Sequence, residues 1–204
     1  MFDECKGACY TAYNRFMRKE PNLKKILTSF ADSLAELKNI RSLTGLSMLL
    51  ALDLVLNLVA SIQITESLRL SFSFIAAALM GMLYGPTCAG IACGIVDILQ
   101  LFIKPTGPYF PGFTLSAVLT GIIFGLFLYK NQCSLKRIII SKALINVFIH
   151  LLLNSVWITV LYGKAFWANI PGRVIKNVGM LPVEIIILMI VLPAVVKILK
   201  SQKH

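Results

Sequence analysis

The side chains most able to do chemistry in this sequence are the polar and ionisable groups that interrupt its long apolar segments. Asp53 and Asn57 lie four residues apart in one such segment, and Asp97 and Gln100 lie three apart in another. Because residues three or four apart share a helix face, each pair would act from one side of a helix. Polar groups buried in lipid cost free energy, so each pair marks a candidate binding or transport site.

A longer polar stripe follows in a later apolar segment, at steps of four, four and three residues. Such groups donate and accept hydrogen bonds, which suits the capture of a polar solute. The alternative for any single residue is a hydrogen bond between neighbouring helices. That alternative is weaker for the whole set, because several segments carry polar groups at a common depth. The stripe comprises Asn146, His150, Asn154 and Trp157, and the last apolar segment adds Asn177 and Glu184.

An intramembrane enzyme is the alternative from another class of protein. His150 could form an acid–base pair with a carboxylate such as Asp53, Asp97 or Glu184. However, the sequence has no paired-histidine metal motif and no nucleophile elbow. Its five cysteines lack the spacing of a zinc site. We therefore expect a binding protein that is not an enzyme and that uses no cofactor and no metal.

Composition indicates that an all-α membrane protein positions these residues. Of 204 residues, 57% are hydrophobic and 14% are charged, and the mean hydropathy is +0.80. In soluble domains roughly a quarter of all residues are charged, more than in this chain. A membrane-spanning helix needs roughly 20 consecutive apolar residues, and several segments here meet that length. Glycine and proline mark the breaks, among them Gly85-Pro86 and Pro171-Gly172. Six transmembrane helices are predicted, at about 44–64, 70–84, 87–103, 113–129, 139–162 and 178–198.

An amphipathic helix is predicted before the first span. Between Lys24 and Arg41, apolar residues recur at three- and four-residue steps with basic residues around them. This pattern favours a helix lying along the lipid headgroups, and the alternative is a short helix packed on a soluble partner. We therefore divide the chain into a cytoplasmic tail (1–23), an amphipathic interfacial helix (24–42) and a six-helix substrate-binding membrane domain (43–200).

The basic residues predict the orientation. With six spans both termini share one side, and that side carries all but five of the 20 lysines and arginines, Lys142 included. Lys/Arg excess marks the cytoplasmic side, so both termini should be cytoplasmic in a multi-pass protein of the cell membrane. The same placement explains the net charge of +11 without nucleic acid. Most polar residues then lie in the outer half of the membrane, as a capture pocket requires and a channel does not.

The outer loops carry cations and aromatic rings. Arg69 and Arg173 are the leading candidates for carboxylate recognition, because the guanidinium group can bind a carboxylate through two hydrogen bonds. Lys176 could attract a dianion, although interfacial anchoring would also explain such a lysine. Aromatic rings near the same surface could hold a flat heterocycle or belong to an interfacial belt. They include Tyr109, Phe110, Phe113 and Trp157.

Three stretches carry a resemblance to a known family. The run from Pro105 to Ala117, PTGPYFPGFTLSA, resembles the loop before the fourth helix of folate-specific S components of energy-coupling-factor (ECF) vitamin transporters. The stretches 161–177 and 29–41 resemble the segment between helices five and six and the approach to helix one. Together the resemblance covers roughly residues 28–200.

The resemblance implies an S component that captures folate from outside and delivers it inward. Its partners would be a transmembrane coupling protein and two ATPases, and it would topple in the membrane to release its substrate. Ser47 and Ala51, small residues four apart on the first span, would dock the coupling protein, although the family more often has alanine at the first position. Another vitamin remains the alternative ligand. The expected ligand-binding residues are Arg69, Asp97, Tyr109, Phe110, Phe113, Asn154, Trp157, Arg173, Lys176 and Asn177.

Overall fold

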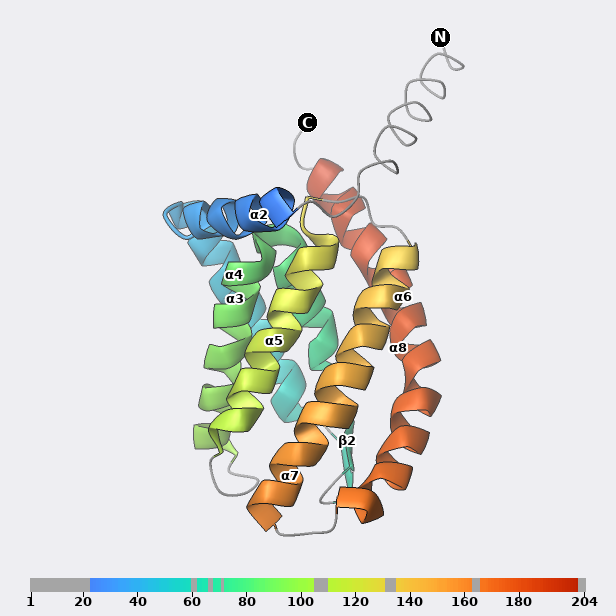
Figure 1. Ribbon diagram of the computed structural model, residues 1–204. Helices are drawn as coiled ribbons and strands as arrows, with labels where there is room; N and C mark the ends of the chain where they lie inside the picture. The colour runs from blue at the N-terminus through green and yellow to red at the C-terminus, as the bar shows by residue number, and fades with distance from the viewer. Residues whose placement is uncertain are drawn as a thin grey trace, which may run out of the picture.

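The computed structural model describes residues 23–59, 62–65, 68–70, 72–104, 110–130, 135–162 and 166–201. These residues form a helical bundle with one short β-hairpin (Figure 1). Five of the described helical segments are long and apolar enough to span a membrane, which confirms a helical membrane protein. The elements are α2 (Leu23–Glu36), α3 (Ile40–Val59), β1 (Ile62–Thr65), β2 (Leu68–Leu70), α4 (Ser73–Ile103), α5 (Pro111–Leu128), α6 (Leu135–Leu144), η1 (Ile145–Leu153), α7 (Asn154–Tyr162) and α8 (Phe166–Ser201).

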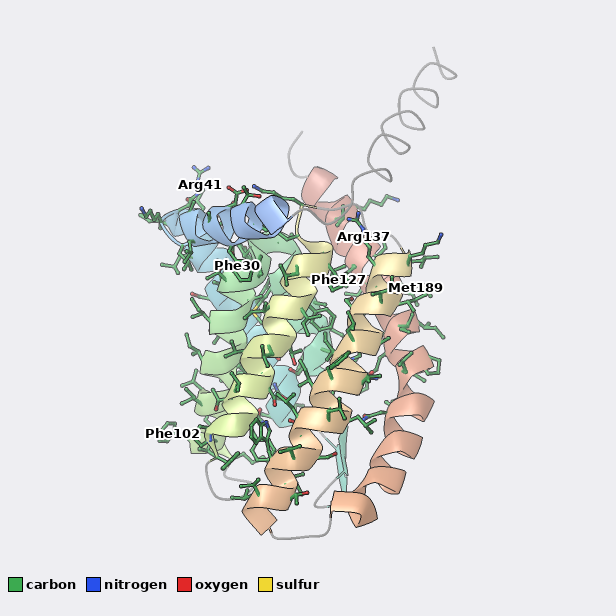
Figure 2. The ribbon with its side chains drawn as sticks, in the orientation of Figure 1. Phe30, Arg41, Phe102, Phe127, Arg137 and Met189 are labelled. Carbon is green, nitrogen blue, oxygen red and sulfur yellow. The ribbon has the colours of Figure 1, made fainter. Side chains whose placement is uncertain are left out.

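α2 lies across one end of the bundle, the end at which α8 finishes (Figure 1). It is shorter than the helix expected at 24–42, because α3 already begins at Ile40. Phe30 points from α2 toward the bundle (Figure 2). The ammonium of Lys130, just after α5, donates a hydrogen bond of 2.8 Å to Asp32, and this bond raises the pKa of Lys130. α2 therefore packs on the bundle end, and its place in the lipid interface stays a prediction.

α4 is divided by a sharp turn at Gly85. The φ of 87° and ψ of −178° at this residue lie outside helical geometry, in a region that glycine tolerates. Pro86 has no N–H to donate, so the helical hydrogen bonds cannot run on through the turn. The expected break at Gly85-Pro86 is confirmed. It separates a first arm, residues 73–84, from a second arm, residues 86–103.

Small residues bring α5 into close contact with the second arm of α4. A Cβ atom at Gly121 would overlap the carbonyl group of Ala89, and one at Gly125 would overlap the backbone of Pro86. Glycine at these positions therefore lets the two backbones touch, as small residues do between membrane helices.

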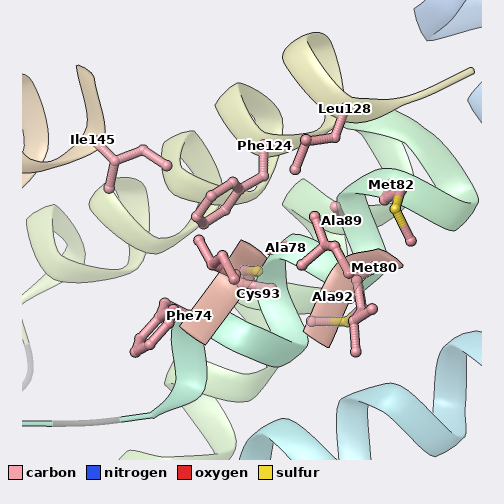
Figure 3. Close-up of a cluster of buried hydrophobic side chains, with 14 of the residues drawn as sticks. Phe74, Ala78, Met80, Met82, Ala89, Ala92, Cys93, Phe124, Leu128 and Ile145 are labelled. Carbon is pink, nitrogen blue, oxygen red and sulfur yellow. The ribbon is translucent and has the colours of Figure 1, made fainter. Parts of the chain in front are cut away.

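A cluster of buried apolar side chains fills the interior of the bundle up to its α2 end (Figure 3). Phe124 of α5 and Met80 of α4 are fully buried, and Leu128 is 2% exposed. Leu188 and Leu192 of α8 are also fully buried in this cluster. Interiors packed in this way leave few voids large enough for water. The bundle is therefore closed at its α2 end.

The opposite end carries the hairpin. β1 pairs with β2 in antiparallel register, with Ile62 opposite Leu70 and Gln63 opposite Arg69. The first span was expected to run to residue 64, and this is wrong because α3 ends at Val59. The segment after α3 is rich in Ile and Thr, residues that favour strands, and pairing in a hairpin gives its own backbone N–H and C=O groups partners.

The last two spans lie close to the expected positions, but the helices that contain them differ from expectation. α6, η1 and α7 form one continuous helical segment whose central part, Ile145–Leu153, is a π-helix. α8 begins at Phe166 and continues through Pro171 and Gly172, so the break expected there is wrong. Proline is tolerated in membrane helices because neighbouring groups can satisfy the freed carbonyl.

Candidate ligand-binding site

A polar cavity of about 250 Å³ lies among α3, α4, α5, α6, η1 and α8. Asp53 and Asn57 enter it from the last two turns of α3, Ser73 from the start of α4, and Gln100 from the end of α4. These positions place the cavity in the half of the bundle away from α2 (Figure 1). Its polar lining comprises Asp53, Asn57, Ser73, Asp97, Gln100, Thr120, Lys142, Asn146, His150, Asn177 and Glu184.

The pair on α3 forms one polar wall of the cavity. Asp53 is 2% exposed and Asn57 is 8% exposed. The Asn57 amide nitrogen donates to the Asp53 carboxylate at 3.2 Å, and Ser73 hydrogen-bonds the same carboxylate. A buried carboxylate needs such partners because burial without them is costly. The expectation that Asp53 and Asn57 share one face is confirmed.

Asp97 connects the cavity to an aromatic group on α5 and α7. The Thr114 hydroxyl donates a hydrogen bond of 2.7 Å to Asp97. Two residues along α5, the Ser116 hydroxyl accepts a hydrogen bond of 3.1 Å from the Trp157 indole nitrogen. The Trp157 ring lies 5.5 Å from that of Phe110.

Phe113 completes this aromatic group, with its ring 6.1 Å from that of Phe110 in an edge-on arrangement. Three of the four aromatic rings expected at the site therefore lie together. None of the three lines the cavity as described, so the group stands beside it. Tyr109, the fourth ring, lies outside the described residues.

The polar stripe at 146–157 is brought together only in part. Asn146 and His150 line the cavity, whereas Asn154 and Trp157 do not. Asn154 reaches back to His150, with 3.4 Å between its amide nitrogen and the His150 Nδ1 atom. The expectation assumed α-helical spacing, but the π-helix bonds each residue to one five positions away, so residues four apart drift around the axis.

The structure adds Lys142, which the sequence did not indicate as a site residue, as the partner of Glu184 in an ion pair. Lys142 is 2% exposed and lines the cavity, with its ammonium 3.1 Å from the Glu184 carboxylate. The same ammonium lies 4.5 Å from the centre of the Phe74 ring. Lys142 was counted with the basic residues of the cytoplasmic side, but it is buried inside the bundle because α6 starts at Leu135 and carries it there. The sequence feature that could have indicated Lys142 as a site residue was a single lysine two turns inside an apolar helix.

Other expected residues have a described backbone only. Arg69 lies in β2 and Arg173 and Lys176 lie in α8, and their side chains are outside what the structure describes. Asn177 lines the cavity. On α3, Ser47 and Ala51 are exposed, and the Ser47 hydroxyl bonds the Leu43 carbonyl of its own helix. The binding and docking roles of all these residues stay predictions.

Comparison with known proteins supplies the class of this protein. The family model of the ECF transporter substrate-specific component matches residues 41–192. The folate transporter FolT of Clostridium novyi (strain NT) is 36% identical over 152 residues, or 74% of this chain and 88% of that protein. The folate transporter FolT of Leuconostoc mesenteroides is 32% identical over 151 residues, or 71% of this chain and 80% of that protein.

A solved structure agrees with these relatives. The crystal structure of FolT bound with folic acid superposes with a TM-score of 0.70 at 33% sequence identity, covering 74% of this chain and 92% of that one. The chain therefore belongs to the family of ECF transporter substrate-specific components. Members of this family are components of transporters, so the alternative of an intramembrane enzyme is set aside.

Proposed function

We propose that this chain is the folate-binding S component of an ECF importer. The observation that carries the proposal is the polar cavity, which lies in one half of the bundle and is sealed from the α2 end by the apolar cluster. A binding protein that takes its ligand from one side needs this asymmetry, whereas a channel needs a polar path throughout. Relatives named folate transporter, and a FolT structure with folic acid, support folate as the ligand.

The size and charge of the cavity indicate how folate would sit. Pockets for whole ligands of this size measure roughly 300–1,000 Å³, so a cavity of about 250 Å³ suits one end of the molecule. Three carboxylates, those of Asp53, Asp97 and Glu184, face it. They would repel the anionic glutamate tail but can accept hydrogen bonds from the pterin. The pterin therefore enters the cavity.

The rest of the ligand would extend toward the aromatic group and the outer cations. The rings of Phe110, Phe113 and Trp157 can stack on its flat middle part. Arg69, Arg173 and Lys176, with Asn177 at the cavity wall, would hold the glutamate carboxylates. Tyr109 and Asn154 would complete the contacts.

The topology that goes with this function has six spans, with the two arms of α4 as separate helices. The first arm has 12 residues, about 18 Å at 1.5 Å per residue, and the hairpin extends it toward the outer surface. Both termini and α2 would be cytoplasmic, in the plasma membrane of a prokaryote. An impermeant thiol reagent should label Lys164→Cys from outside whole cells. Labelling only after the cells are opened would contradict this orientation.

The expected partners are a transmembrane coupling protein and two ATPase subunits, which would supply the ATP hydrolysis. Ser47 and Ala51 offer a small, exposed strip of α3 against which a partner helix could pack closely. The surrounding α3 surface is apolar and exposed, with Met48 at 71% and Val55 at 52%.

Equilibrium binding to the purified chain tests the assignment. Folate should bind saturably and with one site, and mass spectrometry of tightly co-purified ligand should find a folate. Binding of a different vitamin in place of folate would contradict the proposal and would support an S component for that vitamin.

A further inference from the structure

The Lys142–Glu184 ion pair lines the cavity on the side of the apolar cluster. Lys142 comes from α6 and Glu184 from α8, and Phe74 of α4 lies against the ammonium. Just beyond the pair lie Ile138 and Leu188, which are 1% and 0% exposed. The ion pair thus lies where the polar cavity meets the apolar cluster.

Glu184 keeps surface for a ligand. Its Oε2 atom is buried and is the oxygen nearest to Lys142, yet the side chain as a whole is 16% exposed and lines the cavity. A carboxylate offers two oxygens with about four acceptor positions. One oxygen can therefore hold the lysine while the other accepts from a ligand.

Asn146 supplies a donor one turn away from Lys142. It is 4% exposed and lines the cavity, and its amide nitrogen has no hydrogen-bond partner among the described residues. Native proteins pair most of their buried donors, so a buried donor facing a cavity points to a ligand acceptor.

We propose that Glu184 and Asn146 together recognise the hydrogen-bonding edge of the pterin, and that Lys142 positions Glu184 to bind it. The inference rests on the proposed function. A 2-amino-4-oxo heterocycle presents two neighbouring N–H donors beside a carbonyl oxygen. The Glu184 oxygen that does not hold Lys142 has two acceptor positions and accepts from both donors, and the Asn146 amide nitrogen donates to the carbonyl.

Lys142 compensates the negative charge of the buried Glu184 carboxylate. It is the one lysine or arginine in the described cavity lining, against three carboxylates. A buried carboxylate without a counter-ion takes up a proton and loses acceptor strength. Lys142 therefore acts on the ligand through Glu184 and is a positioning residue.

The first test compares folate with the analogue in which hydrogen replaces the 2-amino group. Purified native chain should bind the analogue about 10- to 100-fold more weakly, the usual cost of a lost hydrogen bond to a charged group. In Glu184→Gln this preference should shrink to within about three-fold, because the charged acceptor is gone. Glu36→Gln is the control, since Glu36 bonds Ser42 at the α2 end. Equal affinity of the native chain for both ligands would overturn the inference.

The second test distinguishes a role of Glu184 in ligand recognition from a purely structural role of the ion pair. Lys142→Arg should retain folate binding, and Lys142→Met should lose it. The exchanged variant K142E/E184K restores an ion pair but moves the carboxylate to α6. We expect its thermal unfolding to recover relative to Lys142→Met while folate binding stays lost by at least about ten-fold.

Recovery of both stability and folate affinity in the exchanged variant would show a structural pair only and would overturn the inference. Folate binding by the native chain is measured in the same series. Its absence would instead refute the proposed function, so the two failures can be told apart.

Discussion

The hydroxyl of Ser33 on α2 donates a hydrogen bond of 2.7 Å to the carbonyl oxygen of Tyr84, the last residue before the turn in α4. The Ser33 hydroxyl oxygen also accepts a hydrogen bond of 3.1 Å from the Cys88 N–H, on the far side of the turn. Ser33 is fully buried. One side chain from α2 thus satisfies backbone groups on both arms of α4 that the turn would leave unpaired.

Ser33→Ala should therefore destabilise the protein by about 1–3 kcal/mol, the cost of leaving buried polar groups unpaired. Thermal unfolding of the purified variant in detergent measures this loss. Thr44→Ala is the matched control, because Thr44 is exposed and bonds only within α3. If the two variants unfold at the same temperature, Ser33 does not secure the turn.

Trp157→Ala should weaken folate binding by about 10- to 100-fold, since a stacked ring contributes about 1–3 kcal/mol. Trp157→Phe should lose less, because it keeps a ring and gives up only the bond to Ser116. Binding measured by titration calorimetry checks both. Phe102 is 80% exposed and projects outward near the same end of the bundle (Figure 2), so Phe102→Ala should bind normally. Equal loss in Phe102→Ala and Trp157→Ala would speak against stacking.

Arg173→Ala should weaken folate binding by about ten-fold or more, if its guanidinium holds a ligand carboxylate. An analogue of folate without the glutamate tail should bind the variant and the native chain equally. Arg41→Ala serves as the control, because Arg41 projects from the α2 end (Figure 2). An unchanged dissociation constant for folate would remove Arg173 from the site.

Ala51→Trp should abolish folate uptake by cells and leave binding by the purified chain intact, because a bulky side chain blocks close helix packing. Ile190→Trp is the matched control on the exposed face of α8, and it should transport normally. Uptake that survives Ala51→Trp would show that the coupling protein docks elsewhere.

The sequence predicted the features that depend on local chemistry. Apolar length located the spans, and Gly85-Pro86 located the turn, since both residue types act on the backbone where they stand. The prediction from sequence was wrong where contacts between distant segments determine the local structure. α8 passes through Pro171, and the hairpin replaces the last turn predicted for α3.

The candidate site divides in the same way. Asp97 and Asn177 were expected at the site and line the cavity, because burial of polar groups in a span is a local signal. Lys142 was missed as a site residue, since only the folded bundle brings it to Glu184. Because of the π-helix, Asn154 and Trp157 do not line the cavity. The residue spacing in the sequence did not predict this change of helix type.

Filling the cavity gives the most direct test of the central claim that folate binds there. Ala117 lines the cavity on α5, and Leu115 of the same helix is 49% exposed. Folate titrations of the purified Ala117→Phe and Leu115→Phe variants should be run beside the native chain. The account predicts that Ala117→Phe loses binding by at least about 100-fold, while Leu115→Phe binds as the native chain does. A native dissociation constant in correctly folded Ala117→Phe would contradict it.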